Sequence, residues 1–428
     1  MENNSVNSSR KRSLAISGIL TLSLLAAACS SDSKTTSTSA AAASTTAAST
    51  ASSTATTAAP ETSAADTTVA SSGAGTTEAP ATSEATASST APSTGGTATA
   101  PSVDDKSLSG TLAGSGSTFQ KAFLDEAIAN FSGVAPGLTV SYGGGGSGKG
   151  RTDLQTKLVD YAGTDGTVKP ADVALYTGGT FLYFPTVIAP ITLSYNLSGV
   201  DKLQLSPKTI AGIFQGTITK WNDAAIAADN PKATLPDTNI VTVHRSDASG
   251  TTQNFTTFLD KAVGKASTGE WKLGPFQDPT VWPAGGQAGD GNGGVAQIIS
   301  STAGAIGYVD LSDAKSAGLS FAAVENKAGK FIEPTLEATS AAAENATIKD
   351  DLTFNLGWSD GDASYPIAAQ TWILVYEKQA DAAHADNLKA FLTYLLTEGQ
   401  TLAPTIDYAP LPTSLVAKAL AQIDKITS

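Results

Sequence analysis

The residues best suited to chemistry lie in one stretch, HRSDASGTTQNF, at positions 244–255. Arg245 supplies a positive charge, Asp247 a negative one, and residues 249–252 add three hydroxyl groups around a glycine. No cysteine and no second histidine stands nearby in the sequence to complete a metal cluster or a catalytic triad. The stretch is therefore a cationic, hydroxyl-rich turn in a chain whose formal net charge is −13.

The stretch lies in a predicted unit of a short strand, a turn rich in glycine and hydroxyl groups, and an amphipathic helix, and two earlier stretches show the same pattern. The strands are expected at 111–113, 138–142 and 239–243, the turns at 114–118, 143–150 and 249–252, and the helix faces at 119–131, 154–158 and 255–263. Each turn brings hydroxyls and free backbone N–H groups to a helix start, where the helix dipole adds positive potential. Such a helix start can bind phosphate, sulfate or a carboxylate.

The alternative for each turn is purely structural, because serine and threonine also cap helices and glycine also makes turns. Three such junctions in one domain favour a shared anion site. None of them is a nucleotide-binding P-loop, because Gly148-Lys149-Gly150 lacks the hydroxyl residue that must follow the lysine. Nucleotide hydrolysis is therefore not expected.

A carboxylate also belongs to this set, since residues 159–165 read as a strand that ends at Asp165. An α/β sheet places its ligands at such strand ends. A carboxylate repels an anion unless the anion still carries a proton that the carboxylate can accept, as hydrogen phosphate does near neutral pH and sulfate does not. A site built on that bond rejects an analogue without the proton by orders of magnitude. The alternative is an ordinary surface turn, the commonest role of aspartate before glycine.

The N-terminus is typical of export. A basic start is followed by an apolar run at 14–28, the length of a signal-peptide core. Small residues precede Cys29, the single cysteine, as in a bacterial lipobox, so residues 1–28 are expected to be a lipoprotein signal peptide and Cys29 the lipid attachment site. Ordinary cleavage after an A-x-A sequence is the alternative.

Residues 29–107 are almost entirely Ser, Thr, Ala, Pro and Gly, which predicts a disordered tether; an O-glycosylated stalk is the alternative. The folded part is then 108–428, long enough for two lobes. With no second cysteine there is no disulfide, so its stability must come from its core. The acidic balance argues against a nucleic-acid partner.

Eight stretches carry a resemblance, and their order and spacing hold over nearly all of 108–428. They are LAGSGSTF at 112–119, 144–150, 159–165, FPTV at 184–187, ITKWND at 218–223, 245–251, GAIGYV at 304–309 and DYAPLP at 407–412. Together they resemble the phosphate-binding lipoproteins of bacterial high-affinity phosphate ABC transporters, the PstS family of periplasmic binding proteins.

The resemblance implies a role for each matching residue. Arg245 would be the charged donor, held in place by Asp247 behind it, and Asp165 would accept the phosphate proton. The remaining ligands would donate backbone N–H groups and hydroxyls: Thr118, Phe119, Ser147, Ser249, Gly250 and Thr251. No metal, cofactor or catalytic residue is implied.

The resemblance also implies an α/β fold of the type II periplasmic-binding-protein class, with two lobes joined by a hinge, each a mixed sheet flanked by helices. Lobe one is expected at 108–192 plus 331–428, and lobe two at 193–330. The implied function is an extracytoplasmic, membrane-anchored receptor that hands inorganic phosphate to an ABC permease and ATPase. The alternatives are a secreted phosphatase-like enzyme and a surface protein that uses the fold without transport.

Overall fold

A computed structural model of the chain describes residues 105–344 and 346–428. The expectations for the signal peptide, Cys29 and nearly all of the tether fall outside the described residues. All that follows concerns the described residues.

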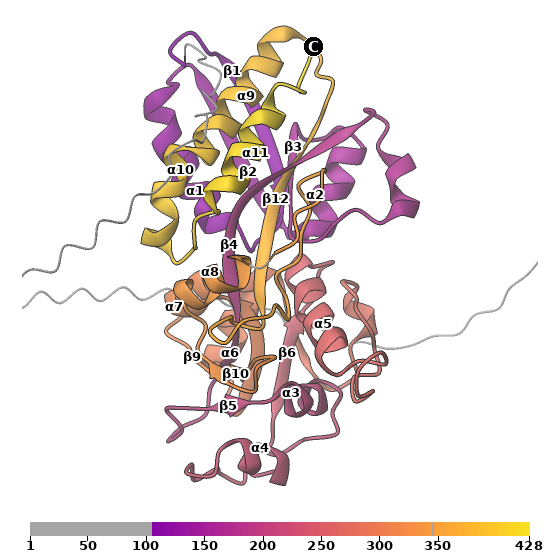
Figure 1. The fold of residues 1–428 in the computed structure, drawn as a ribbon, viewed down its shortest axis with the longest axis vertical. Coiled ribbons are helices and arrows are strands. Elements are labelled where there is room, and N and C mark those ends of the chain that lie inside the picture. Colours follow the sequence, from indigo (N-terminus) through magenta and orange to yellow (C-terminus); the bar gives the residue numbers. More distant parts are fainter. Residues whose placement is uncertain (1–104, 345) are drawn as a thin grey trace, which may run out of the picture. The chain divides into compact units, whose positions relative to one another are not determined.

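The first strand–turn–helix unit is present, with β1 at Gly110–Gly116 and α1 at Lys121–Val134, but the strand takes in residues 114–116, which were predicted to lie in the turn. β1 lies between two parallel partners, β2 (Leu138–Gly145) and β3 (Tyr161–Thr164). The sheet therefore aligns the carboxyl ends of three strands, where the turns of interest begin (Figure 1).

The second unit differs from the prediction, because the glycine run is not a loop. β2 takes in Gly145, and α2 begins directly at Gly146 and ends at Gln155. Leu158, expected on the helix face, follows the helix and is 73% exposed. Glycine has no side chain to report a periodicity, so the pattern could not place this helix start.

One long strand, β4 (Phe181–Tyr195), joins the two parts of the sheet. Up to Pro190 it pairs antiparallel with β12 (Ala368–Tyr376), and from Ile191 it pairs antiparallel with β8 (Ala305–Asp310). The strand order is β2-β1-β3-β12-β4-β8-β6-β7. The predicted two-lobed α/β fold is thus built on a sheet whose halves share β4, and not on two separate sheets (Figure 1).

The second half of the sheet carries the third predicted unit. β6 (Val241–Arg245) pairs in parallel with β7 (Gln287–Gly289) and with β8. β6 leads into α5 (Gly250–Val263), and β7 leads into α6 (Gly291–Ser301). Two helix starts therefore lie at the carboxyl ends of neighbouring parallel strands.

The other elements complete the described part. The short strands are β5 (Gln204–Leu205), β9 (Ser320–Phe321), β10 (Ala323–Glu325) and β11 (Phe331–Ile332). The helices are α3 (Pro207–Phe214), α4 (Ala224–Asp229), α7 (Leu311–Ser316), α8 (Leu336–Glu344), α9 (Ala382–Leu396), α10 (Glu398–Leu402) and α11 (Thr413–Ile423). The 3-10 turns are η1 (Pro170–Leu175), η2 (Pro279–Val281) and η3 (Ala403–Ile406).

The limits of the lobes stay a proposal, and the strand pairing favours one change to them. β11 pairs with β10, which pairs with β5 in a small second sheet. β5 and β10 lie in the part that was expected to be lobe two, whereas β11 lies just past its expected end, so the pairing favours placing β11 in lobe two as well. We propose that the chain returns to lobe one at β12.

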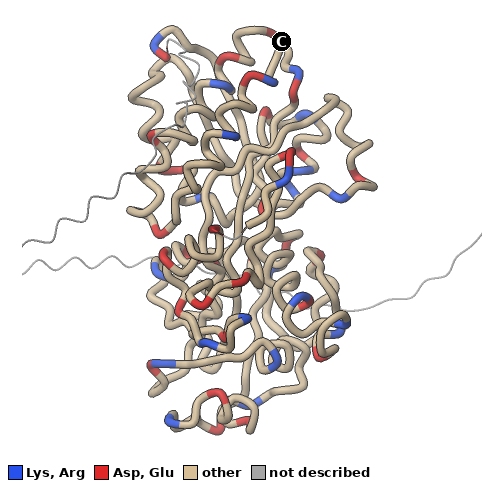
Figure 2. The backbone as a smooth tube through the Cα atoms, in the orientation of Figure 1, with Lys and Arg blue, Asp and Glu red and all other residues tan. Residues whose placement is uncertain are grey.

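The core is continuous through much of the described part and includes fully buried aromatic side chains such as Trp221, Trp271 and Trp372. A smaller apolar cluster of Val243, Val295 and Ile299 lies between β6 and α6. Basic and acidic residues are scattered among each other along the described backbone (Figure 2). None of the helices described is long and apolar enough to cross a membrane.

Candidate functional site

Asp165 lies directly after β3 and is 1% exposed. Three hydroxyl groups from different segments donate to its carboxylate: Ser117 at 2.5 Å, Thr371 at 2.7 Å and Ser147 at 3.3 Å. The backbone N–H of Asp165 donates in return to Ser147 Oγ at 3.1 Å. The aspartate is therefore held in a hydroxyl-lined pocket and is not the surface turn residue that the alternative described.

The charge state of Asp165 is set by opposing effects. Burial raises the pKa of its carboxyl, while the hydroxyl donors of Ser117, Thr371 and Ser147 and the positive charge of Arg245 lower it. The neighbours thus oppose the effect of burial and favour the ionised carboxylate, which is the form that can accept a hydrogen bond from a protonated ligand.

Arg245 ends β6 and is also 1% exposed. Its Nε and Nη2 donate to the two oxygens of Asp247 at 2.7 and 2.5 Å, which is a bidentate ion pair. Its Nη1 donates to Thr251 Oγ1 at 3.3 Å and to Asn292 Oδ1 at 3.1 Å. Asp247 fixes one edge of the guanidinium, and Nη1 lies among neutral groups at the starts of α5 and α6.

The start of α5 supplies backbone N–H groups. Ser249 caps the helix, since its Oγ accepts from the Thr252 N–H at 3.1 Å. The N–H of Ser249 itself donates to the carbonyl of Gln277 at 3.1 Å, so of its two donors only the hydroxyl proton remains for a ligand. Gly250 and Thr251 occupy the first turn, where N–H groups lack helical partners.

The loop after β1 is held from both sides. The N–H of Phe119 donates to Ser117 Oγ at 3.1 Å, and the hydroxyl of Thr118 accepts from the Asn292 N–H at 3.1 Å. In this structure these groups therefore satisfy one another across the loop and the start of α6. A ligand that used the Phe119 N–H would take the place of Ser117 Oγ.

Close glycine contacts bring these segments together. A Cβ added at Gly250 would lie 2.4 Å from Ser147 Oγ and 2.6 Å from Asp165 Oδ2, so the start of α5 lies directly against both residues. A Cβ at Gly146 would lie 1.9 Å from Asp247 Oδ2. Ser147, Asp165, Asp247 and the start of α5 thus converge on one polar centre, which we call the anion site for the role proposed below.

We expect Gly250→Ala to weaken anion binding, because the added methyl group would separate α5 from Asp165 and Ser147. Overpacking of this kind costs about 1–3 kcal/mol. The matched control is Gly133→Ala in α1, which has no atom within 4 Å of the new Cβ and is expected to leave binding unchanged. Titration calorimetry of both variants checks the difference, and equal affinities would show that the contact is not part of the site.

Sequence reasoning missed several residues of the anion site, among them Ser117, Thr371, Asn292, Asn254 and Gln370. Asn254 donates from α5 to the carbonyl of Asp165 at 2.7 Å, and Gln370 of β12 donates to the same carbonyl at 3.3 Å. Thr371 and Asn292 lie far along the chain from the motifs that they join. Only Ser117 lay inside a predicted turn, where its hydroxyl could have identified it as a candidate site residue.

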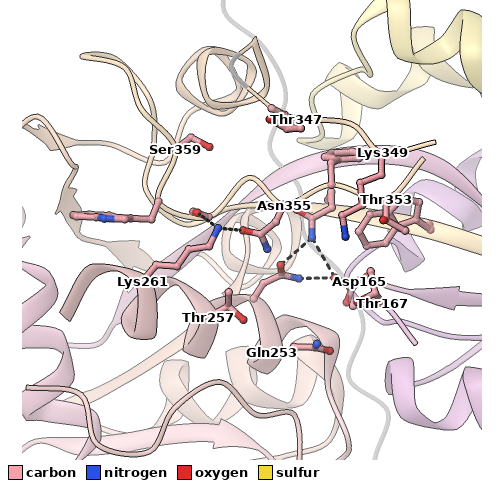
Figure 3. A pocket seen from close by; sticks show the side chains of 18 of the residues that line it. Asp165, Thr167, Gln253, Thr257, Lys261, Thr347, Lys349, Thr353, Asn355 and Ser359 are labelled. Atoms are coloured by element: carbon pink, nitrogen blue, oxygen red, sulfur yellow. Dashed lines mark hydrogen bonds between the residues drawn. The ribbon is translucent and has the colours of Figure 1, made fainter. Parts of the chain in front are cut away.

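A second pocket, with a volume of about 440 Å³, reaches the backbone side of Asp165 (Figure 3). Lys261, Lys349, Asn355 and Thr353 are among its lining residues. Lys261 Nζ already donates to the carbonyl of Gly357 at 2.9 Å and to the side chain of Asn355. Within the described residues, no group of three or more His, Cys, Asp or Glu side chains is placed to hold a metal ion.

Comparisons with known proteins agree on one family. Residues 80–398 match the family model of the PBP superfamily domain. The chain is similar to the phosphate-binding protein PstS of Xylella fastidiosa (strain 9a5c), with 37% identity over 71% of this chain and 82% of the relative. It is also similar to the phosphate-binding protein PstS of Methanocaldococcus jannaschii, with 38% identity over 73% of this chain and 85% of the relative.

Solved structures support the fold. The chain matches a high-affinity periplasmic phosphate-binding protein (PfluDING) bound with phosphate, with a TM-score of 0.62 and 23% identity over 73% of this chain and 94% of that one. It also matches a phosphate-binding protein from Stenotrophomonas maltophilia, with a TM-score of 0.58 and 20% identity over the same shares. At these identities the structural likeness speaks for the two-lobed fold alone.

Proposed function

We propose, from the premise that this chain belongs to the PstS family of phosphate-binding proteins within the periplasmic-binding-protein superfamily, that it is an extracytoplasmic receptor for inorganic phosphate. The bound phosphate would be delivered to an ABC transporter for import. The observation that carries the proposal is that a buried carboxylate, Asp165, and a buried guanidinium, Arg245, lie in one hydroxyl-lined site, while Arg245 forms its ion pair with Asp247.

This pairing suits hydrogen phosphate. The guanidinium and the start of α5 attract the negative charge, and Asp165 can accept the proton that hydrogen phosphate keeps near neutral pH. Sulfate offers only lone pairs to that carboxylate, so it would meet repulsion and an unmade hydrogen bond. We assign phosphate binding to Thr118, Phe119, Ser147, Asp165, Arg245, Ser249, Gly250 and Thr251, with Asp247 as the support of Arg245.

Binding by a few charge-assisted hydrogen bonds fits a transport receptor. Such bonds contribute roughly 1.5–3 kcal/mol each, and micromolar affinity requires about 8 kcal/mol. A site with few charged donors reaches that range and still releases its ligand when the lobes separate.

The context of the receptor is part of the proposal. Cys29 would carry the lipid after removal of residues 1–28, and the tether 29–107 would connect it to the folded part at the outer face of the cell membrane. The partners would be the permease and ATPase of the transporter, and no cofactor would be needed.

The test of the proposed function is calorimetric titration of the whole chain with phosphate, arsenate and sulfate. We expect tight binding of phosphate and of arsenate, which also keeps a proton, and little heat with sulfate. Equal affinity for sulfate would remove the role of Asp165. A robust metal-dependent turnover of a phosphate ester would instead favour the phosphatase alternative.

A further inference from the structure

A second buried arginine lies beside Asp165. Arg151 and Arg245 are the two arginines of the chain outside its first twelve residues, and they are 7% and 1% exposed. Arg245 has its carboxylate partner, Asp247. The hydrogen-bond partners that the structure gives to Arg151 are all neutral, so its charge needs another counterpart.

Arg151 projects from α2 and binds both neighbours of Asp165. Its Nη1 donates to Thr164 Oγ1 at 2.7 Å and to the carbonyl of Gly166 at 3.4 Å. The Thr164 hydroxyl in turn donates to the Gly166 carbonyl at 2.8 Å. The guanidinium therefore holds the turn that carries Asp165 from both ends.

The other nitrogen of Arg151 connects this turn to the second half of the sheet. Nη2 donates to Gln277 Oε1, and the backbone carbonyl of Gln277 accepts the Ser249 N–H at 3.1 Å. Ser249 caps α5. A short chain of hydrogen bonds thus runs from the Asp165 turn to the helix start on which the anion is proposed to bind.

Arg151 also affects the charge balance of the site. Burial lowers the pKa of Arg151, and the negative charge of Asp165 opposes that shift. Hydrogen phosphate would enter a site that already holds Asp165 and Asp247, and among the residues that the structure describes Arg245 is the only other buried cation. Burying charges without compensation is costly, so a second guanidinium favours the doubly charged anion.

We infer that Arg151 is a positioning residue of the anion site. It fixes the turn that carries Asp165, ties this turn to the start of α5 through Gln277, and adds the second positive charge that a doubly charged phosphate requires. This inference rests on the proposed function and deepens it.

The test compares Arg151→Gln, Arg151→Lys and wild type by phosphate titration at several pH values. We expect Arg151→Gln to weaken binding about tenfold or more at neutral pH, because hydrogen bonds from a charged group are lost. The loss should grow from mildly acidic to mildly alkaline pH, as phosphate gains its second charge. Arg151→Lys should bind more weakly than wild type but keep the wild-type pH profile.

Four neighbouring groups act electrostatically on the Arg151 guanidinium and bear on this pH profile. They are Tyr176, Tyr183, Asp165 and Asp172. Burial raises the pKa of both tyrosines, so they stay neutral in this range. Asp165 is unchanged in all three proteins. A merely structural role of Arg151 would lower the affinity equally at every pH.

Two further variants test the inference: a control on the same helix and a variant that removes only the link to α5. Lys149→Gln removes an exposed charge that pairs with Asp153 on the same helix, and it should change neither affinity nor pH profile. Gln277→Ala removes only the link to α5, and it should speed phosphate release severalfold even if Arg151→Gln fails to fold.

Wild-type affinity and pH profile in Arg151→Gln would overturn the inference. So would a parallel loss at all pH values, or, if that variant does not fold, an unchanged release rate in Gln277→Ala. If the wild-type protein binds no phosphate, the proposed function fails instead, and the two failures are distinct.

Discussion

Arg245→Ala is expected to weaken phosphate binding by about 3 kcal/mol or more, roughly a hundredfold or more. The substitution removes the guanidinium that donates to Thr251 and Asn292, and it leaves Asp247 without its cation. An unpaired carboxylate beside the site then repels the anion that Arg245 attracted. Calorimetry measures the loss.

A matched control removes an exposed cation. Lys220→Ala breaks an ion pair with Asp237 at 2.5 Å in which both side chains are at least half exposed, and we expect no change in affinity. Circular dichroism of ligand-free Arg245→Ala should show the native fold. If that folded variant binds phosphate as wild type does, phosphate binds somewhere other than the anion site.

Asp165→Asn is expected to change selectivity more than affinity. The side-chain oxygen of asparagine can still accept the phosphate proton, while the negative charge that excludes sulfate is gone. The ratio of the sulfate and phosphate dissociation constants should therefore fall by at least about a hundredfold. Competition titrations with the two anions measure this ratio.

The direction in which Asp165→Asn changes the folding stability can also be predicted. Because burial raises the pKa of Asp165 in the folded protein, its ionised form disfavours folding at neutral pH. That cost falls as the pH drops through the folded pKa and is gone below the pKa of the unfolded chain. The melting temperature of ligand-free Asp165→Asn should thus not fall below that of wild type at neutral pH.

The control for selectivity is Asp160→Asn. The carboxylate of Asp160 accepts the Ala113 N–H at 2.7 Å, and its replacement should leave the selectivity between phosphate and sulfate unchanged. A selectivity for phosphate that survives Asp165→Asn would contradict the role of the carboxylate.

Local patterns predicted the elements whose apolar residues repeat. The helix face at 119–131 is α1, and the alternation at 138–142 lies in β2. In each case the burial of one face demands a period that the sequence displays.

The remaining features depend on contacts between distant residues. The sequence around Thr371 does not indicate that its hydroxyl donates to Asp165, which lies 206 positions away in the chain. Arg151 reads as a polar residue of a short helix until the fold buries it beside Thr164 and Gln277. The resemblance implied which residues bind phosphate, but the residues that support them follow only from the way in which the two halves of the sheet come together.

A crystal structure of the protein with phosphate tests the central claim most directly. We expect one phosphate at the start of α5, with an oxygen in a short hydrogen bond to the carboxylate of Asp165 and Arg245 Nη1 donating to another oxygen. Phosphate found only in the pocket beside Lys261 and Lys349, with Asp165 and Arg245 as they are in the ligand-free protein, would contradict the account (Figure 3).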